Sequence, residues 1–379
     1  MILHSIRLLS FRAHEQTQVS FAPKVNLIHG PNGAGKTNVL EAIHYLCLSK
    51  SFVVSQDSYA LRKGAPYFEI EGHFEGTRRP ELLVRLVYLP DQGKSILVNK
   101  APVERLSQVV GMLPVVVFSP EDHALTAGGP DQRRRFVNNV LSQARPVYLD
   151  DVLKYGRALK QRNELLTQQR RRGVSPGFKT QLESWNEELV VLGARVILAR
   201  MRFISTFAGF LERAHEKFGE AVERPTAEYV TIGDIPPDAD EAEIEQLFRE
   251  KLHRAGRREV ELGRTMVGPH LDEIIFRLND FEVRRYASQG QHRTFGMALK
   301  LAQYFYLQDR LDEKPILLLD DVFGSLDPAR IQSFLELLKG DDVGQTIMTA
   351  TQVSPFDDFV PFDDPACSSI RIVDGQVEQ

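Results

Sequence analysis

The sequence of 379 residues predicts an α/β protein in which one domain is assembled from both ends of the chain around an inserted helical domain. Three observations predict this fold. Strand and helix patterns alternate near both termini, the middle of the chain is mostly helical, and a glycine-rich segment lies between an early strand and an early helix. A chain of this length can bury a substantial core.

The N-terminal part of this domain, residues 1–125, consists mainly of strand patterns. The largely apolar run at 25–28 predicts a buried strand, and the apolar spacing over 38–46 predicts a helix. Further strands are expected over 68–98, with a hairpin turn at 91–94.

The middle of the chain, residues 126–255, is the expected inserted domain. It is rich in Leu, Arg, Gln, Glu and Ala and keeps helical periodicity to about residue 225. One break at 173–177 predicts long antiparallel helices on either side. An acidic stretch with two prolines, over 234–245, is typical of a linker.

The C-terminal part, residues 256–379, returns to alternating elements and is expected to complete the first domain. Strand patterns cover 273–278, 316–319, 346–349 and 370–373, and helical patterns cover 291–311 and 331–338.

The charge balance excludes a global basic field, because 47 Lys and Arg face 51 Asp and Glu, a net charge of −4. DNA binding needs only a local patch. Basic clusters occur at Arg133–Arg135, at Arg170–Arg172, and at Arg254 with Arg257 and Arg258. Each cluster also fits a solvated helix face, which is the commoner case.

The cellular compartment follows from what the sequence lacks. No apolar run approaches the length of a membrane span, and Met1 to Arg7 alternates like a strand rather than forming the apolar block of a secretory signal. The two cysteines, Cys47 and Cys367, fit no metal-ligand spacing. We therefore expect a protein of the reducing cytoplasm, with no membrane partner.

The glycine-rich segment is the clearest functional motif. It comprises Gly30, Pro31, Asn32, Gly33, Ala34, Gly35, Lys36 and Thr37. Its glycines allow backbone N–H groups to point at a β-phosphate, and the following helix presents its positive end. Lys36 would neutralise phosphate oxygens, and the Thr37 hydroxyl would ligate Mg²⁺. The segment therefore predicts an ATP site with Mg²⁺.

An acidic pair completes the expected metal site. The apolar run 316–319 predicts a buried strand that ends in Asp320 and Asp321. Asp320 would hold Mg²⁺ through water, and Asp321 would orient or deprotonate the attacking water. Asp321 and Lys36 are therefore the candidate catalytic residues.

A third segment, Tyr286 to Gln291, stands at the head of the helix over 291–311. Its serine, its glycine and the amides of the helix start could form a second anion site. One nucleotide needs two such sites only if it is sandwiched between two protomers. An ordinary helix cap explains the same residues equally well.

Together these motifs resemble the ATP-binding-cassette ATPases and, within them, the SMC-like heads of DNA repair. The closest resemblance is to the RecF family of bacterial recombination mediators, and it runs from the first strand to about Thr351. The residues that carry it are Val117–Asp122, Arg133–Phe136, Gly268–His270, Tyr286–Thr294 and Leu318–Phe323. The resemblance implies an ABC-type P-loop ATPase head.

The resemblance also implies function. It implies a cytoplasmic, nucleoid-associated protein of replication, recombination, DNA damage repair and the SOS response. Such a protein forms an ATP-dependent homodimer, engages single-strand/double-strand DNA junctions, and hydrolyses ATP weakly. With RecR and RecO it helps to load recombinase at gaps and to restart replication.

Specific residue roles follow from the resemblance as well. It implies that Ser288, Gln289 and Gly290 contact the γ-phosphate bound to the opposite protomer. In the segment Ser325–Pro328, it places Asp327 at the dimer interface. Arg12, after the first strand, is implied as a contact to the nucleotide.

The sequence departs from the family pattern at several positions. Leu271 follows His270 where the family usually has Arg, and His292 stands where a second Gln is common. The region Ser119–Asp122 has no Gln to contact the metal. After the strand at 346–349 come Ala350 and Thr351 rather than His, which suggests slow hydrolysis.

Two other functional classes remain as alternatives. A transporter-energising subunit would need a Leu-Ser-Gly-Gly-Gln type signature and a surface for a membrane partner. A structural SMC-type head would need long heptad runs in the insert, which is too short for an extended coiled coil.

Overall fold

In the computed structural model the chain divides into two units. Residues 1–378 are described, except for 174–175, 219–222, 324–327, 354–355 and 357–359. The first unit comprises Met1–Asp122, Arg213–Ala221 and Gly296–Gln379, and the second comprises His123–Glu212 and Val222–Phe295. The first unit therefore takes residues from both ends of the chain.

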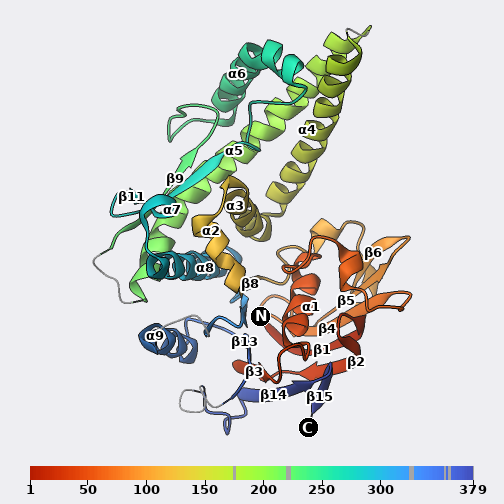
Figure 1. Ribbon diagram of the computed structural model, residues 1–379, viewed down its shortest axis with the longest axis vertical. Coiled ribbons are helices and arrows are strands. Elements are labelled where there is room, and N and C mark those ends of the chain that lie inside the picture. The colour runs from red at the N-terminus through yellow and green to blue at the C-terminus, as the bar shows by residue number, and fades with distance from the viewer. Residues whose placement is uncertain (174–175, 219–222, 324–327, 354–355, 357–359, 379) are drawn as a thin grey trace. The chain divides into compact units, whose positions relative to one another are not determined.

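An antiparallel sheet of six strands forms one layer of the first unit, in the order β2-β1-β4-β5-β6-β7 (Figure 1). Its strands are β1 (Ile2–Phe11), β2 (His14–Ser20), β4 (Phe68–Glu75), β5 (Leu82–Leu89), β6 (Gly93–Val98) and β7 (Ala101–Pro102). In β5 every second residue is buried, so one face of the sheet is turned to the core.

The second sheet has the order β15-β14-β3-β13-β12-β8, and only β15 is antiparallel to its neighbour. Its strands are β3 (Val25–His29), β8 (Val115–Phe118), β12 (Ile316–Asp320), β13 (Thr346–Ala350), β14 (Cys367–Val373) and β15 (Gln376–Glu378). In this sheet β3 and β8 from the N-terminal part of the chain are interleaved with β12 to β15 from the C-terminal part. Because β3 and β12 are both parallel to β13, their carboxyl ends lie at one edge.

Helix α1 (Lys36–Leu48) packs against strands of both sheets, including β1, β4, β12 and β13. Every residue from Val39 to Leu48 is buried, as expected of a helix enclosed on all sides. The shared core joins apolar side chains of both sheets and of α1. The unit also contains α9 (Pro328–Lys339) and the 3₁₀ turns η1 (Asp57–Ala60), η2 (Leu106–Gln108) and η3 (Pro120–Asp122).

The second unit is built mainly of helices. These are α2 (His123–Ala127), α3 (Pro130–Ala144), α4 (Pro146–Arg172), α5 (Phe178–Glu216), α6 (Glu241–Leu262), α7 (Val283–Tyr286) and α8 (Gln289–Leu311). The last part of α5 and most of α8 belong to the first unit. A core of its own packs α4, α5 and α6 together and includes Phe248 and the partly buried Trp185. None of the described helices is long and apolar enough to cross a membrane.

The second unit differs from the expected insert in two respects. It contains a sheet of order β11-β10-β9, formed by β9 (Pro225–Val230), β10 (Glu273–Leu278) and β11 (Phe281–Glu282). It also continues to Phe295 rather than ending at residue 255, because β10 pairs along its whole length with β9.

The prediction of a linker over 234–245 is wrong for the second half of that range. Helix α6 begins at Glu241, and its N-cap Asp240 accepts a hydrogen bond from the backbone N–H of Glu243. The Glu243 side chain in turn accepts one from the backbone N–H of Asp240. The acidic residues there form a capping box. The same acidic composition is also typical of a solvated linker, which is why the prediction was wrong there.

Candidate functional site

The glycine-rich segment forms the connection from β3 to α1, as predicted. Gly30, Gly33 and Gly35 have φ angles of +145°, +82° and +103°, which L side chains rarely adopt. A Cβ at Gly30 would lie 2.0 Å from the carbonyl oxygen of Ile372 in β14. Glycine is therefore required at Gly30 both by the backbone angle and by the neighbouring strand.

Lys36 and Thr37 begin α1, and both side chains turn back toward the sheet edge. The Lys36 ammonium donates to the carbonyl oxygens of Gly30 and Pro31, each at 2.8 Å. The Thr37 hydroxyl donates to Oδ1 of Asp320 at 2.8 Å. Two motifs separated by more than 280 residues in sequence therefore meet through a direct hydrogen bond.

Asp320 ends β12 and Asp321 follows it, and Thr349 of β13 forms a hydrogen bond with each of them. The Thr349 hydroxyl donates to Oδ1 of Asp320 at 2.9 Å and accepts from the backbone N–H of Asp321 at 3.0 Å. Asp320 is largely buried, whereas Asp321 is exposed and has a left-handed backbone with φ +48°. Asp321 thus directs its carboxylate to solvent beside a buried, hydrogen-bonded Asp320.

Burial shifts the titration of both charged groups at this edge. It lowers the pKa of the Lys36 ammonium, against the carboxylates of Asp321 and Asp320, which raise it. It raises the pKa of the Asp320 carboxyl, against hydrogen bonds from Thr37 and Thr349, which lower it. Charges that are partly withdrawn from water act strongly on a phosphate or a metal ion.

Arg12 lies in the turn between β1 and β2, and it has an acidic partner. Its guanidinium donates to both carboxylate oxygens of Glu41, at 2.8 and 2.7 Å, and to the carbonyl oxygen of Tyr59 at 2.9 Å. Glu41 is fully buried in α1. These bonds use three of the five N–H groups of the guanidinium, so one N–H on each terminal nitrogen remains for a further acceptor such as a nucleotide.

His14, for which the sequence predicted no role, contacts the glycine-rich loop. Its Nε2 lies 3.0 Å from the carbonyl oxygen of Gly35, and its Nδ1 lies 2.9 Å from that of Gly375. The ring is fully buried, and burial lowers its pKa. His14 therefore joins the phosphate loop to the β14–β15 turn. No local pattern marks such a role, because it depends on contacts distant in sequence.

The segment Tyr286 to Gln291, which we call the signature segment, lies in the second unit. The Ser288 hydroxyl accepts from the backbone N–H of Gln291 at 3.2 Å, and Gln291 Oε1 accepts from the backbone N–H of Ser288 at 2.8 Å. Ser288 therefore caps α8, as one of the two sequence interpretations expected. Ser288 and Gln289 are exposed, and Gly290 is half-buried. Asp327 and Ser325, two residues before it, lie outside the described residues.

The first of the three basic clusters is structural in large part. Arg133 is buried and donates to both carboxylate oxygens of Glu273 at 2.8 and 2.9 Å. Arg134 donates to the carbonyl oxygen of Asp272. Only Arg135 of this cluster is exposed.

In the other two clusters, the arginines whose side chains the structure describes are exposed. In the second cluster, Arg170 donates to the carbonyl oxygen of Leu262 at the end of α6. In the third cluster, Arg254 and Arg257 are exposed and form ion pairs along α6. Arg254 pairs with Glu250, and Arg257 pairs with Glu261.

The segment Gly268–His270 makes close packing contacts within the second unit. The Tyr155 hydroxyl is 2.7 Å from Nδ1 of His270, and a Cβ at Gly268 would lie 2.5 Å from the same hydroxyl. The buried Asp272 that follows accepts from Arg200 at 2.6 Å. Leu271, the departure from the family pattern, is 55% exposed, and nothing in the structure explains the leucine.

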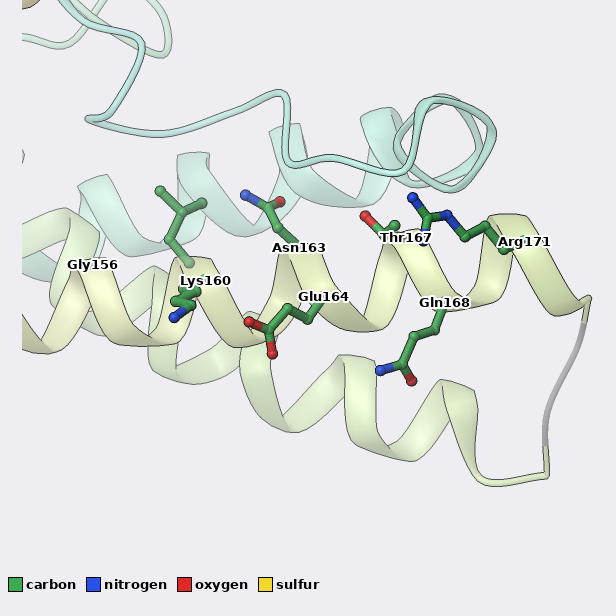
Figure 2. A pocket seen from close by; sticks show the side chains of 8 residues that line it. Gly156, Lys160, Asn163, Glu164, Thr167, Gln168 and Arg171 are labelled. Atoms are coloured by element: carbon green, nitrogen blue, oxygen red, sulfur yellow. The ribbon is translucent and has the colours of Figure 1, made fainter.

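A groove of about 600 Å³ runs along α4 in the second unit (Figure 2). Figure 2 shows Lys160, Glu164 and Gln168 on one side of the helix and Asn163, Thr167 and Arg171 on the other. Asn163 and Thr167 are engaged in hydrogen bonds to Thr265 and Gly263. The groove carries both signs of charge, and we assign no ligand to it.

Comparison with known proteins identifies the family. The sequence matches the family model described as RecF/RecN/SMC N terminal domain over residues 2–359. The DNA replication and repair protein RecF of Salinibacter ruber is 57% identical over 94% of this chain and 86% of that protein. The chain belongs to the RecF family. The RecF of Chloroherpeton thalassium is 42% identical over 94% of this chain and 96% of its own length.

Solved structures confirm the predicted head fold. A structure described as the recombination mediator protein RecF-ATP in the RecFOR pathway has a TM-score of 0.88 at 30% identity. The match covers 100% of this chain and 97% of that one. An Smc head domain from Pyrococcus furiosus has a TM-score of 0.55 at 15% identity, covering 100% and 95%, and shares the fold alone. The expected family and the expected ATPase-head fold are therefore both confirmed.

Proposed function

We propose that this protein is an ATP-dependent DNA-binding clamp of recombinational repair. It binds ATP and Mg²⁺, dimerises on them, engages single-strand/double-strand DNA junctions, and hydrolyses ATP weakly when DNA stimulates it. In this role it helps to load recombinase at gaps and to restart replication. Membership of a family whose curated members are named DNA replication and repair proteins supports the proposal.

One observation carries the nucleotide part of the proposal, namely the 2.8 Å hydrogen bond between Thr37 and Asp320. A hydroxyl at the start of α1 and a carboxylate at the end of β12 are the oxygen ligands that Mg²⁺ prefers. A Cβ added at Gly33 would meet no neighbouring atom of the described residues within 4 Å, so the loop is open on that side. The residues present therefore fit a magnesium–nucleotide pair.

The chain's own groups would then act in defined ways. Backbone N–H groups over Gly30 to Gly35 would hold the phosphates, and Lys36 would turn from the loop carbonyl oxygens toward them. Thr37 and Asp320 would hold Mg²⁺, which supplies neutralisation of the phosphate charge. The exposed Asp321 would orient the attacking water. Thr349 would keep both aspartates in place.

Dimerisation is proposed from the signature segment. Ser288, Gln289 and Gly290 would contact the γ-phosphate on the partner protomer, which the backbone amides at the start of α8 favour. Arg12, held by Glu41, would contact the nucleotide through an N–H group that this pair leaves unused. We infer that the dimer works in the bacterial cytoplasm on nucleoid DNA together with RecR and RecO. A relative described as a recombination mediator in the RecFOR pathway supports this inference.

Light scattering tests the proposal directly. The mass of the wild-type protein should double with ATP and Mg²⁺ and rise further with gapped DNA. Ser288→Arg should remain monomeric while its ATP affinity stays within about threefold, because the substituted side chain blocks only the partner's phosphate. Ser205→Arg, at another exposed serine on α5, is the matched control and should dimerise normally. A wild-type mass that ATP leaves unchanged would refute the clamp.

A further inference from the structure

Two exposed aromatic side chains lie at the start of the signature segment and in the strand just before it. Phe281 of β11 and Tyr286 of α7 are 64% and 67% exposed. Their ring centroids are 5.9 Å apart, at an interplanar angle of 69°. Because the rings do not stack on one another, flat ring faces remain open to solvent. Neither ring therefore contributes much to the core of the second unit.

The backbone holds these rings on ordered elements. β11 pairs with β10 through Leu278 opposite Phe281, across a tight turn at Asn279 and Asp280 with φ +48° and +69°. Val283, 1% exposed, is the side chain that anchors this part to the core. Single exposed apolar residues are common and need no explanation. Two neighbouring aromatic rings held on an anchored turn are instead typical of a binding surface.

The charge around the rings is positive. Arg284 and Arg285 are both exposed, and Nε of Arg285 lies 3.1 Å from Oε2 of Glu282. From Asp280 to Arg293 there are three arginines, one aspartate and one glutamate, so 3 − 2 gives a formal charge of +1. The whole chain has a net charge of −4. The local excess therefore favours an anionic occupant that also has apolar faces.

We propose that Phe281 and Tyr286, together with Arg284 and Arg285, form a stacking site for single-stranded DNA. This inference rests on the proposed function and names a surface that takes the unpaired strand. Unpaired bases expose flat faces that stack on aromatic rings, and guanidinium groups bind the phosphates between them. Bases in a duplex are already stacked on each other, so this surface selects the single-stranded side of a junction.

Fluorescence anisotropy with labelled oligo-dT and a duplex of equal length tests the site. Phe281→Ser with Tyr286→Ser should weaken oligo-dT binding about 100-fold, roughly tenfold for each ring, and leave duplex binding unchanged. Phe281→Tyr with Tyr286→Phe keeps both rings and should bind normally. Arg284→Gln should reduce the slope of log affinity against log salt concentration for oligo-dT by the amount that corresponds to about one phosphate contact. Arg254→Gln on α6 should leave that slope unchanged.

A second readout reports stacking itself. An oligonucleotide that contains 2-aminopurine should change its fluorescence on the wild-type protein and not on the double serine variant. Trp185 fluorescence and ATP binding check that the variants are folded. If the wild type binds no oligo-dT, the proposed function fails at its DNA step. If the wild type binds and the double serine variant binds equally well, only this inference fails. Loss of ATP-dependent dimerisation with retained oligo-dT affinity would make the surface a contact with a second copy, and would also overturn the inference.

Discussion

The hydroxyl of Thr349 is placed to order the acidic pair, because it donates to Asp320 and accepts from the backbone of Asp321. In Thr349→Val the shape is kept, but the N–H of Asp321 loses its partner and Asp320 loses a donor. We expect ATP hydrolysis in the presence of DNA to fall roughly tenfold, because both carboxylates are less well positioned. Phosphate release measures this effect.

Two further measurements separate this role from a general loss of structure. The free energy of unfolding of Thr349→Val should fall by about 1–2 kcal/mol, the usual cost of an unpaired buried group, and ATP affinity should change little. Thr349→Ser retains the hydroxyl and should hydrolyse ATP close to the wild-type rate. Equal hydrolysis by the valine variant and the wild type would show that Thr349 does not position the aspartates.

At the scale of single residues, the sequence predicted those positions whose spacing along the chain is itself the motif. Gly30 to Thr37 and the pair after β12 are of this kind, and Thr37 does meet Asp320. Thr349 and His14 could not be found, because their contacts depend on strand neighbours that local sequence does not reveal. The contact of Arg12 with the nucleotide stays a prediction, and its pairing with Glu41 could not be found because it depends on how α1 packs against the β1–β2 turn.

The capping box of α6 gives a prediction at the scale of elements. Asp240 and Glu243 exchange two hydrogen bonds of 2.9 Å at the helix start. Asp240→Ala should lower the free energy of unfolding by about 1 kcal/mol, because the backbone N–H of Glu243 loses the side chain that accepts its hydrogen bond. Asp238→Ala removes the same charge from an exposed neighbouring position and should have almost no effect. Urea unfolding followed by Trp185 fluorescence compares the two variants, and an equal loss in both would attribute the effect to charge alone.

The strands and helices of the first unit were largely predictable, because each apolar run has the length and period of one element. The run at Val25 to Ile28 became β3, and the run at Ile316 to Leu319 became β12. The end of the second unit was not predictable. Whether β10 belongs to the ATPase part or to the insert depends on its pairing with β9, more than 40 residues earlier. Composition carries no information about that pairing.

At the scale of the whole molecule, each unit has a hydrophobic core cluster among the described residues, and each unit has a histidine whose pKa burial lowers. In the first unit, burial lowers the pKa of His44 to about 3, and its Nδ1 lies 2.6 Å from the carbonyl oxygen of Lys50. In the second unit, burial lowers the pKa of His270 to about 4. Trp185, the chain's single tryptophan, packs in the second core only. Its fluorescence therefore reports on one unit, whereas far-ultraviolet circular dichroism reports on both.

These histidines predict how stability depends on pH. Each folded-state pKa lies below the unfolded value of 6.5, so the unfolded chain binds more protons in acid and stability falls as pH decreases below 6.5. Between pH 6.5 and the folded pKa values, the loss is on the order of 5 kcal/mol for His44 and 3 kcal/mol for His270. His270→Gln should flatten the acid dependence of the Trp185 transition, and His44→Gln should leave that transition unchanged. His44→Gln should flatten the acid dependence of the unfolding of the first unit, which is followed by circular dichroism because Trp185 does not report it. If both variants moved the Trp185 transition equally, the two units would unfold as one cooperative unit, and the assignment of each histidine to its own transition would fail.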